Sequence, residues 1–302
     1  MASKEVIGTL LAFCTAIISG FAIFANKFFI IGLDPVVFTA LRAIIIGLVF
    51  LVMSLVFNSW GKKENKKLRW GYLVVIGLIG GGLAFLWFFS GLKITTGGRA
   101  AFLHKTLPLY VLVLAFLFLK EKITKKQVFA MLLMIGGIAV MSFSSIVPSA
   151  LWLNPQMGDA LILGATILWA FENVIAKKAM LRGEHNFVVS FARMFFGAVF
   201  LFGVALLRGK IWLIFGLTGT QWFYIALSTI ILFGYVLTYY WAIRYINVSK
   251  AATILLLSPV ITLVLGGVFL GEPMPVLQLA GSALILVGAY FIATVKSEFS
   301  RV

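Results

Sequence analysis

Apolar residues fall into ten long runs, separated by short polar or charged segments. A helix needs roughly 20 apolar residues to cross a bilayer, and each run is about that long. The pattern therefore predicts an all-α integral membrane protein with ten transmembrane helices and short linkers, the most charged of which is 61–69 (GKKENKKLR). The predicted helices span 6–31, 35–57, 70–92, 98–119, 126–145, 158–180, 187–208, 220–243, 250–270 and 275–295.

Composition places the chain in the lipid bilayer. Hydrophobic residues make up 62% of it and charged residues 11%, whereas soluble domains are about 45–50% apolar and about 25% charged. The net charge of +16 could indicate a nucleic-acid partner, but most basic residues lie in the gaps between apolar runs, as they do in cytoplasmic loops. We therefore expect no nucleic-acid partner.

The distribution of Lys and Arg predicts the orientation. With the N-terminus inside, 17 of the 25 basic residues lie in cytoplasmic segments and six on the other side. Cytoplasmic loops carry such an excess of positive charge. We expect a multi-pass protein of the cell membrane with both termini cytoplasmic.

A single cysteine, Cys14, excludes an intrachain disulfide. The chain has no GxxxxGK[ST] loop, which argues against coupling to ATP, and we expect neither a metal nor another cofactor. A membrane-embedded enzyme is the alternative from another class. It would need paired carboxylates, a histidine cluster or an activated nucleophile, and the two distant histidines and few intramembrane acids offer little for one.

An internal repeat is the strongest long-range signal. A constant shift of 151 residues relates the pairs Lys27/Lys178, Arg42/Arg193, Pro108/Pro259, Glu121/Glu272, Gln127/Gln278 and Gly137/Gly288. Each half, 1–147 and 148–302, holds five predicted helices. Because five is odd, the second copy enters the membrane from the opposite side. Such an inverted repeat is typical of alternating access around a site near the bilayer midplane.

Two segments carry a resemblance to a known family. They are LKITTGGRAAFLHKTLPLYVLVLAFLFLKEKIT and AIRYINVSKAATILLLSPVITLVLGGVFLGEP, and ILWAFENVIAKKAM opens the second half. Together they resemble the paired signatures of the EamA-like branch of the drug/metabolite transporter superfamily, over nearly the whole chain. The resemblance implies ten helices in two inverted repeats and movement of small metabolites, often amino acids, without ATP. The chain departs from the family at 18–20, where a Trp is common, and has Lys120 where its own second copy has Gly271.

The fourth predicted helix carries unusual polar residues. His104 and Lys105 lie about a third of the way into the run from Arg99 to Glu121. A Lys near the centre of a membrane helix costs roughly 2.5–3.5 kcal/mol, so Lys105 should face a cavity. Pro108 has no N–H for the carbonyl of His104, and Pro259 leaves that of Leu255 free in the same way. We expect these prolines to act as hinges lining a cavity.

Polar residues present in only one copy are the best candidates for substrate contact. His104 and Lys105 correspond to Leu255 and Leu256, and Glu172 and Asn173 correspond to Phe21 and Ala22. At about 1.5 Å per residue, Lys105 lies roughly 10 Å and Glu172 roughly 21 Å from the same face. Our hypothesis is that Lys105 attracts an anionic group, while Glu172 attracts an amine or carries a proton. The alternative is that Lys105 is merely neutralised by Glu172 or by a carbonyl.

Other candidates have simpler alternatives. His104 could titrate and gate transport, or simply pack against a neighbouring helix. Trp169, Trp87, Tyr235 and Tyr239 could form a cavity wall, although aromatic residues at helical spacing are usually ordinary packing. The remaining features are expected to be structural. They are Arg42 and Arg193 as snorkelling residues or a structural pair, Glu121 and Glu272 as caps or ion-pair partners, the paired glycines 80–82, 97–98, 136–137 and 266–267 at close helix contacts, and His185 in a solvated loop.

These observations favour a secondary transporter or facilitator that moves small polar metabolites, with amino acids or related compounds as the first candidates. A lipid or drug exporter is the alternative within transport. A facilitator and a proton antiporter differ only in coupling, and a pH-gradient dependence that is lost in Glu172→Gln would favour the antiporter. The pattern leaves the substrate, the direction, the coupling ion and the oligomeric state open.

Overall fold

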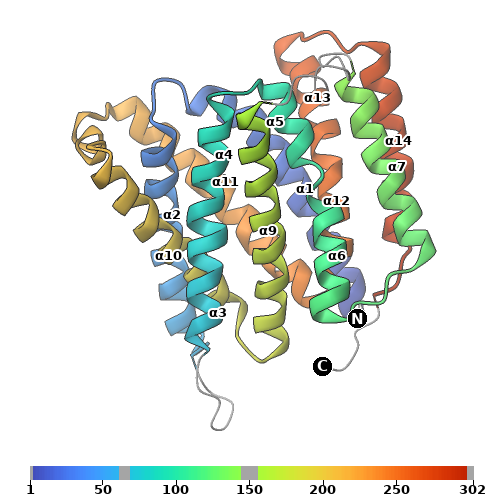
Figure 1. Cartoon of the computed structure of the whole chain (residues 1–302), viewed down its shortest axis with the longest axis horizontal. Coiled ribbons are helices and arrows are strands. Elements are labelled where there is room, and N and C mark those ends of the chain that lie inside the picture. Colours follow the sequence, from blue (N-terminus) through green and yellow to red (C-terminus); the bar gives the residue numbers. More distant parts are fainter. Residues whose placement is uncertain (1–2, 61–68, 144–155, 298–302) are drawn as a thin grey trace.

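The computed structural model describes residues 3–60, 69–143 and 156–297. In this part of the chain every regular element is helical, and ten helical spans are long and apolar enough to cross a membrane (Figure 1). The ten predicted runs are thereby confirmed, with ends that differ by a few residues. The predicted boundary at 147/148 and most of the linker 61–69 lie outside the described residues.

Seven of these ten spans are uninterrupted helices. In chain order they are α1 (Lys4–Phe29), α2 (Pro35–Val56), α7 (Lys125–Ser142), α9 (Met157–Leu181), α10 (Asn186–Leu207), α11 (Gly219–Tyr245) and α14 (Val276–Ala293). The other three spans are composite. They are α3 (Trp70–Val75) with η1 (Ile76–Leu83) and α4 (Ala84–Leu92), α5 (Gly97–His104) with α6 (Leu107–Leu119), and α12 (Val248–Ile254) with η3 (Leu255–Leu257) and α13 (Ser258–Leu270).

Several of these helices have a side-chain cap at their N-terminus. The Asp34 carboxylate accepts the amide of Val36 at 3.0 Å ahead of α2, whose first residue is Pro35. Helix starts leave backbone N–H groups without partners, and such caps satisfy them. Burial raises the pKa of Asp34, but an ion pair with Lys210 and the backbone hydrogen bonds outweigh it, so the pKa lies below its ordinary value. Asp34 therefore remains a charged cap at neutral pH.

Helix packing exchanges partners between the two halves. Helix α1 packs on α11 and α13 of the second half, and α9 packs on α4, η1 and α6 of the first. The equivalent helices α2 and α10 pack on each other, as do α7 and α14. This reciprocity is the pattern expected when two copies of one five-helix unit are related by a pseudo-two-fold axis.

The directions of α1 and α9 are opposite. Gly8, near the start of α1, lies against Tyr245 and Ile246 at the end of α11. Lys177, near the end of α9, donates hydrogen bonds to the carbonyls of Ile243 and Ile246 in the same place. Thus α1 begins where α9 ends, which is the geometry of an inverted repeat.

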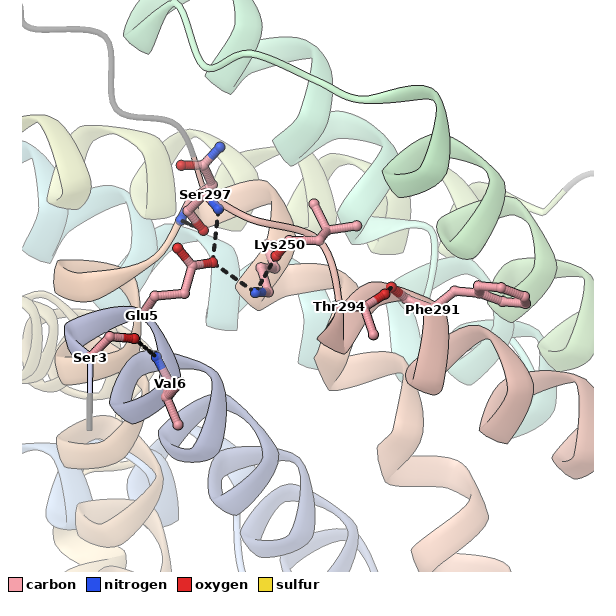
Figure 2. Close-up of polar contacts among 9 residues, drawn as sticks. Ser3, Glu5, Val6, Lys250, Phe291, Thr294 and Ser297 are labelled. Atoms are coloured by element: carbon pink, nitrogen blue, oxygen red, sulfur yellow. Dashed lines mark hydrogen bonds and ion pairs between the residues drawn. The ribbon is translucent and has the colours of Figure 1, made fainter. Parts of the chain in front are cut away.

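The described ends of the chain meet on one face, called here the terminal face. Figure 2 shows Glu5 accepting hydrogen bonds from the Ser297 amide, at 2.8 Å, and from the Lys250 ammonium, at 3.0 Å. Lys250 also donates to the carbonyl of Val295 at 2.6 Å. An even number of spans requires both ends on one side. That this side is cytoplasmic stays a prediction.

Both fourth spans are broken at the predicted prolines. Helix α5 ends at His104 and α6 starts at Leu107, with Pro108 in its first turn. In the second half, the 3₁₀ turn η3 separates α12 from α13, which carries Pro259 in its first turn. Discontinuous helices of this kind form the sites of many secondary transporters.

Candidate substrate cavity

A cavity of about 470 Å³ lies in the middle of the bundle, between the two halves. It has the size of a small-molecule site. Its lining comes from α1, α2, α4, α5, α6, α9, α10, α11, α12 and η3. The side chains that carry its polar character are Ser19, Asn26, Arg42, His104, Lys105, Trp169, Asn173, Arg193, Ser228 and Tyr235.

The cavity reaches the face opposite the termini. Its lining includes Leu92 and Gly97, which flank the loop between α4 and α5 on that face. From the terminal face inward to the second helix break, residues 246–256 are all buried. The structure therefore has one closed and one more open end.

Arg42 on α2 is 6% exposed, and within the described ranges its side-chain hydrogen-bond partners are hydroxyl groups. It donates to Ser228 at 2.9 Å and to Thr39 at 3.5 Å, and its guanidinium stacks 4.0 Å from the Phe38 ring centroid. Its Nε is buried without a hydrogen-bond partner. Ser228 in turn donates to Asn26 at 2.7 Å.

Lys105 lies at the break between α5 and α6. Its ammonium donates to the hydroxyl of Ser258 at 2.7 Å, across the interface with α13. His104, beside it, packs edge-on against Trp169 and Phe88, with ring centroids 4.9 Å and 5.5 Å away. The His104 Nδ1 is buried without a hydrogen-bond partner. Both residues line the cavity.

Arg193 on α10 connects the cavity to a buried acid. Its Nε lies 3.7 Å from Oε2 of Glu172, and its guanidinium lies 5.7 Å from the Tyr240 ring centroid. Glu172 is 0% exposed and accepts a hydrogen bond from the Tyr240 hydroxyl. Its side chain also fills the space beside Gly80, where a Cβ would collide with it. Arg193 therefore stands between the cavity and Glu172.

The π-helical segment η1 brings α9 and α10 close to the cavity. The backbone of Arg193 packs on Gly81, so a Cβ there would collide with it. The carbonyl of Gly80 accepts a hydrogen bond from Nε1 of Trp169 at 3.0 Å. Segments of π-helix are frequent at functional sites. The predicted close helix contact at these glycines is present.

Six of the ten predicted site or hinge residues line the cavity, namely His104, Lys105, Pro108, Trp169, Asn173 and Tyr235. Four do not, namely Trp87, Glu172, Tyr239 and Pro259. The alternative reading, in which Glu172 neutralises Lys105, does not apply in this structure, because Lys105 donates to Ser258 and Glu172 pairs with Arg193. Contact with substrate stays a prediction for all of them.

Each of the four has a packing reason for its place. Trp87 is 36% exposed and covers Gly164 on α9, while its neighbour Phe88 faces the cavity. Tyr239 is 1% exposed and stacks on Tyr235, with ring centroids 5.8 Å apart. Glu172 is held by Arg193 behind the wall, and at the second break Leu255 and Leu256 line the cavity in place of Pro259.

Sequence reasoning treated Arg42 and Arg193 as snorkelling residues or a structural pair, and both line the cavity instead of reaching for the surface. Arg193 is also half of a structural pair, with Glu172. The missed signal was the presence of a cation at the same depth in both copies. Asn26 and Ser228 carried no signal, because isolated small polar residues are common in membrane helices.

Outside the cavity, several of the other structural expectations hold, but the paired glycines are not all at close helix contacts. A Cβ at Gly97 or Gly136 would meet nothing within 4 Å, and at Gly266 and Gly267 it would meet the side chains of Glu272 and Met274 just after α13, not another helix. Glu121 caps α12, Glu272 pairs with Lys27, and a Cβ at Gly137 would collide with α14. His185 is not in a solvated loop, because it is half-buried and its Nδ1 accepts the Phe187 amide at 3.3 Å as the cap of α10. Burial, and then Arg244, lower the pKa of His185.

Comparison with known proteins identifies the family. The model of the EamA-like transporter family matches the chain twice, over residues 6–143 and 156–294. The chain belongs to the EamA-like transporter family. The two matches fall on the two halves that the shift of 151 residues relates, although the boundary between them stays a prediction.

Relatives span most of the chain. It is 27% identical over 241 residues to the uncharacterized transporter YyaM of Bacillus subtilis (strain 168), covering 79% of this chain and 78% of that protein. It is 26% identical over 281 residues to an uncharacterized transporter of Archaeoglobus fulgidus, covering 90% and 94%. One crystal structure matches with a TM-score of 0.77 at 19% identity, over 96% of this chain and 98% of the other. That likeness supports the fold alone.

Proposed function

We propose that this EamA-family transporter is a secondary transporter or facilitator for small polar metabolites, amino acids and related compounds among them. It would move them across the cell membrane by alternating access. The central cavity carries the proposal, because equivalent positions from both halves line it together. These pairs are Arg42/Arg193, His104/Leu255, Lys105/Leu256 and Ala22/Asn173.

Two further features support alternating access. The helix breaks and the Lys105 cation lie beside the cavity, where irregular backbone is tolerated in a membrane. The two membrane faces also differ, since residues 246–256 are buried from the terminal face inward to the second helix break. If that face is cytoplasmic, as the excess of basic residues predicts, this structure is open toward the outside.

Flux into liposomes tests the proposal. The purified protein would be reconstituted and its uptake of labelled amino acids and carboxylic acids measured, with the Lys105→Met variant beside it. Lys93→Met is the matched control, because Lys93 is exposed in the loop after α4. We expect saturable uptake that Lys105→Met reduces at least tenfold and Lys93→Met leaves intact. Absence of saturable uptake, or wild-type flux in Lys105→Met, would overturn the proposal.

A lipid or drug exporter is the second candidate. Phe85, Phe88, Phe89 and Leu92 give the cavity a long apolar wall, which would suit such a substrate. Proton coupling through Glu172 is proposed for either case. Uptake that responds to an imposed pH gradient in the wild type, but not in Glu172→Gln, is its test.

A further inference from the structure

Cations are the charged groups that line the cavity. Arg42, Lys105 and Arg193 are in the lining, and no Asp or Glu of the described residues is. Among the described residues, the carboxylate that pairs with one of these cations is Glu172, which is 0% exposed and lies behind Arg193. A ligand in the cavity therefore meets positive charge and finds no accessible negative charge.

Two of the three cations lack an acidic partner. In the described part of the chain, the ion pairs reach neither Arg42 nor Lys105, whose side-chain partners are hydroxyl groups. Buried charges in proteins are usually paired, because an isolated one loses its hydration. A ligand carboxylate would give such a cation the acidic partner that it lacks, through charge-assisted hydrogen bonds that are stronger than those to hydroxyls.

Much of the remaining lining is apolar. The lining includes Phe85, Phe88, Trp169 and Leu232. The Trp169 N–H is not available to a ligand, because it donates a hydrogen bond to the carbonyl of Gly80. Aromatic walls of this kind suit an apolar or aromatic body. For an ammonium group, the lining offers only neutral acceptors such as Asn26, Asn173 and Ser228.

We propose that the cavity selects a small organic acid, held by its carboxylate at Arg42 and Lys105 and by an apolar body on the aromatic wall, and that it needs no amino group. The inference rests on the proposed transport function and narrows it. A carboxylic acid should bind at least as well as the amino acid that shares its body, and the matching amine should not bind.

Three ligands with one phenylethyl body test this in detergent. Binding of 3-phenylpropanoate, phenylalanine and 2-phenylethylamine would be measured by calorimetry, and Arg42→Gln and Lys105→Met compared with Arg208→Gln, a cation outside the cavity. We expect the acid to bind at least as tightly as phenylalanine and the amine to show no binding. Each cavity variant should weaken the acid tenfold or more, and Arg208→Gln should not.

Several outcomes would overturn the inference. They are phenylalanine binding ten times more tightly than the acid, binding of the amine, absence of acid binding, or an unchanged affinity in both cavity variants. Flux is measured separately in liposomes. Uptake of amines alone would overturn this inference but still support the transport function. Binding of the acid without flux would overturn the proposed transport but still support the ligand class.

A second inference rests on a different observation, the closure at the terminal face. Glu121, just after α6, accepts the amides of Val248 and Ser249 at 2.8 and 3.3 Å and the Ser249 hydroxyl at 2.6 Å. Glu121 is 5% exposed, and burial raises its pKa, while hydrogen bonds from Ser249 and Val248 oppose the rise. This contact joins the end of α6 in the first half to the start of α12 in the second.

The equivalent contact on the opposite face is not formed. The shift of 151 residues maps Glu121 onto Glu272, and Val248 and Ser249 onto Gly97 and Gly98. Glu272 is half exposed and pairs with Lys27 instead. Gly97 and Gly98 are exposed at the start of α5, and a Cβ at Gly97 would meet nothing within 4 Å.

We infer that the two contacts are a pair of alternating gates. When the cavity opens toward the terminal face, the hydrogen bonds of Glu121 to α12 break. Glu272 then accepts hydrogen bonds from the backbone amides of Gly97 and Gly98. Two other contacts between the halves, Arg99 with Asp159 and Lys250 with Glu5, are both formed in this structure. These pairs lie on opposite faces and can act as fixed supports while the gates exchange.

Labelling of one cysteine in the cavity tests the exchange. Ala101, which lines the cavity, becomes Cys in a Cys14→Ser background, and an impermeant maleimide is added from the side opposite the termini. We expect Glu121→Gln to slow labelling severalfold and Glu272→Gln to leave it as fast or faster. Equal labelling rates in the two variants, or a rate in Glu121→Gln as fast as in the parent, would overturn the gate.

Discussion

Arg42 and Arg193 occupy equivalent positions in the two halves and both line the central cavity, yet only Arg193 pairs with a carboxylate. Removing Arg193 would leave Glu172 buried without its cation, and breaking a buried ion pair in this way costs about 3–5 kcal/mol. Removing Arg42, by contrast, breaks hydrogen bonds to the hydroxyl groups of Ser228 and Thr39 and strands no charge among the described residues. We therefore expect Arg193→Met to lower the thermal unfolding midpoint in detergent far more than Arg42→Met.

A double variant supplies the control for this prediction. Glu172→Gln removes the stranded charge, so Arg193→Met with Glu172→Gln should recover at least half of the loss in the unfolding midpoint. Additive losses in the double variant would mean that the 3.7 Å pair does not stabilise the fold.

Two adjacent glycines on α7 should respond differently to alanine. A Cβ at Gly137 would collide with the backbone of Gly281 and with Ile285 on α14, whereas one at Gly136 would meet nothing within 4 Å. Overpacking of this kind costs about 1–3 kcal/mol, and alanine at an open helix position gains about 0.5–1 kcal/mol over glycine. Thermal unfolding of Gly137→Ala and Gly136→Ala in detergent should therefore shift in opposite directions. Equal shifts would contradict the close α7–α14 contact.

His185 should make stability depend on pH. Its folded pKa is lowered by burial and then by Arg244, so protons bind more readily to the unfolded chain. The stabilising effect of neutral His185 is complete above its ordinary pKa of 6.5 and is lost as the pH falls toward the folded pKa. The Nδ1 that caps α10 is also the atom that protonation would occupy.

His185→Asn is the informative variant, because asparagine is a good N-cap and does not titrate. Unfolding midpoints measured from pH 7.5 down to pH 5 should fall less steeply in His185→Asn than in the wild type. Parallel curves would show that another group carries the pH dependence.

Trp169→Phe should loosen the π-helical segment. The variant keeps an aromatic ring in the wall but removes the donor to the Gly80 carbonyl, and a buried acceptor left unsatisfied costs about 1–3 kcal/mol. Trp222→Phe, at a residue that is 41% exposed, is the matched control. A loss of unfolding midpoint confined to Trp169→Phe is expected. An equal loss in both would mean that ring size, not the hydrogen bond, matters.

Much of the fold can be predicted because length and hydropathy identify membrane helices in a sequence. The ten spans and both proline breaks follow from local pattern. Lys105 was found because an isolated cation in an apolar run must be placed somewhere polar.

The rest depended on contacts between distant segments. Glu172 and Asn173 are neighbours in sequence, but Arg193 and the space beside Gly80 hold Glu172 behind the wall while Asn173 lines the cavity. Likewise, helical rotation puts Phe88 in the cavity and Trp87 over Gly164. A one-residue step turns a helix by about 100°, so the facing side cannot be known until the neighbours are.

The contact of Glu5, Lys250 and Val295 also orders biosynthesis (Figure 2). Glu5 is synthesised early, and its partner Lys250 follows 245 residues later in the chain. The carbonyl of Val295 emerges from the ribosome later still. Lys250 therefore gains both of these partners only after α14 has been made, which makes the insertion of α14 the step that closes this contact.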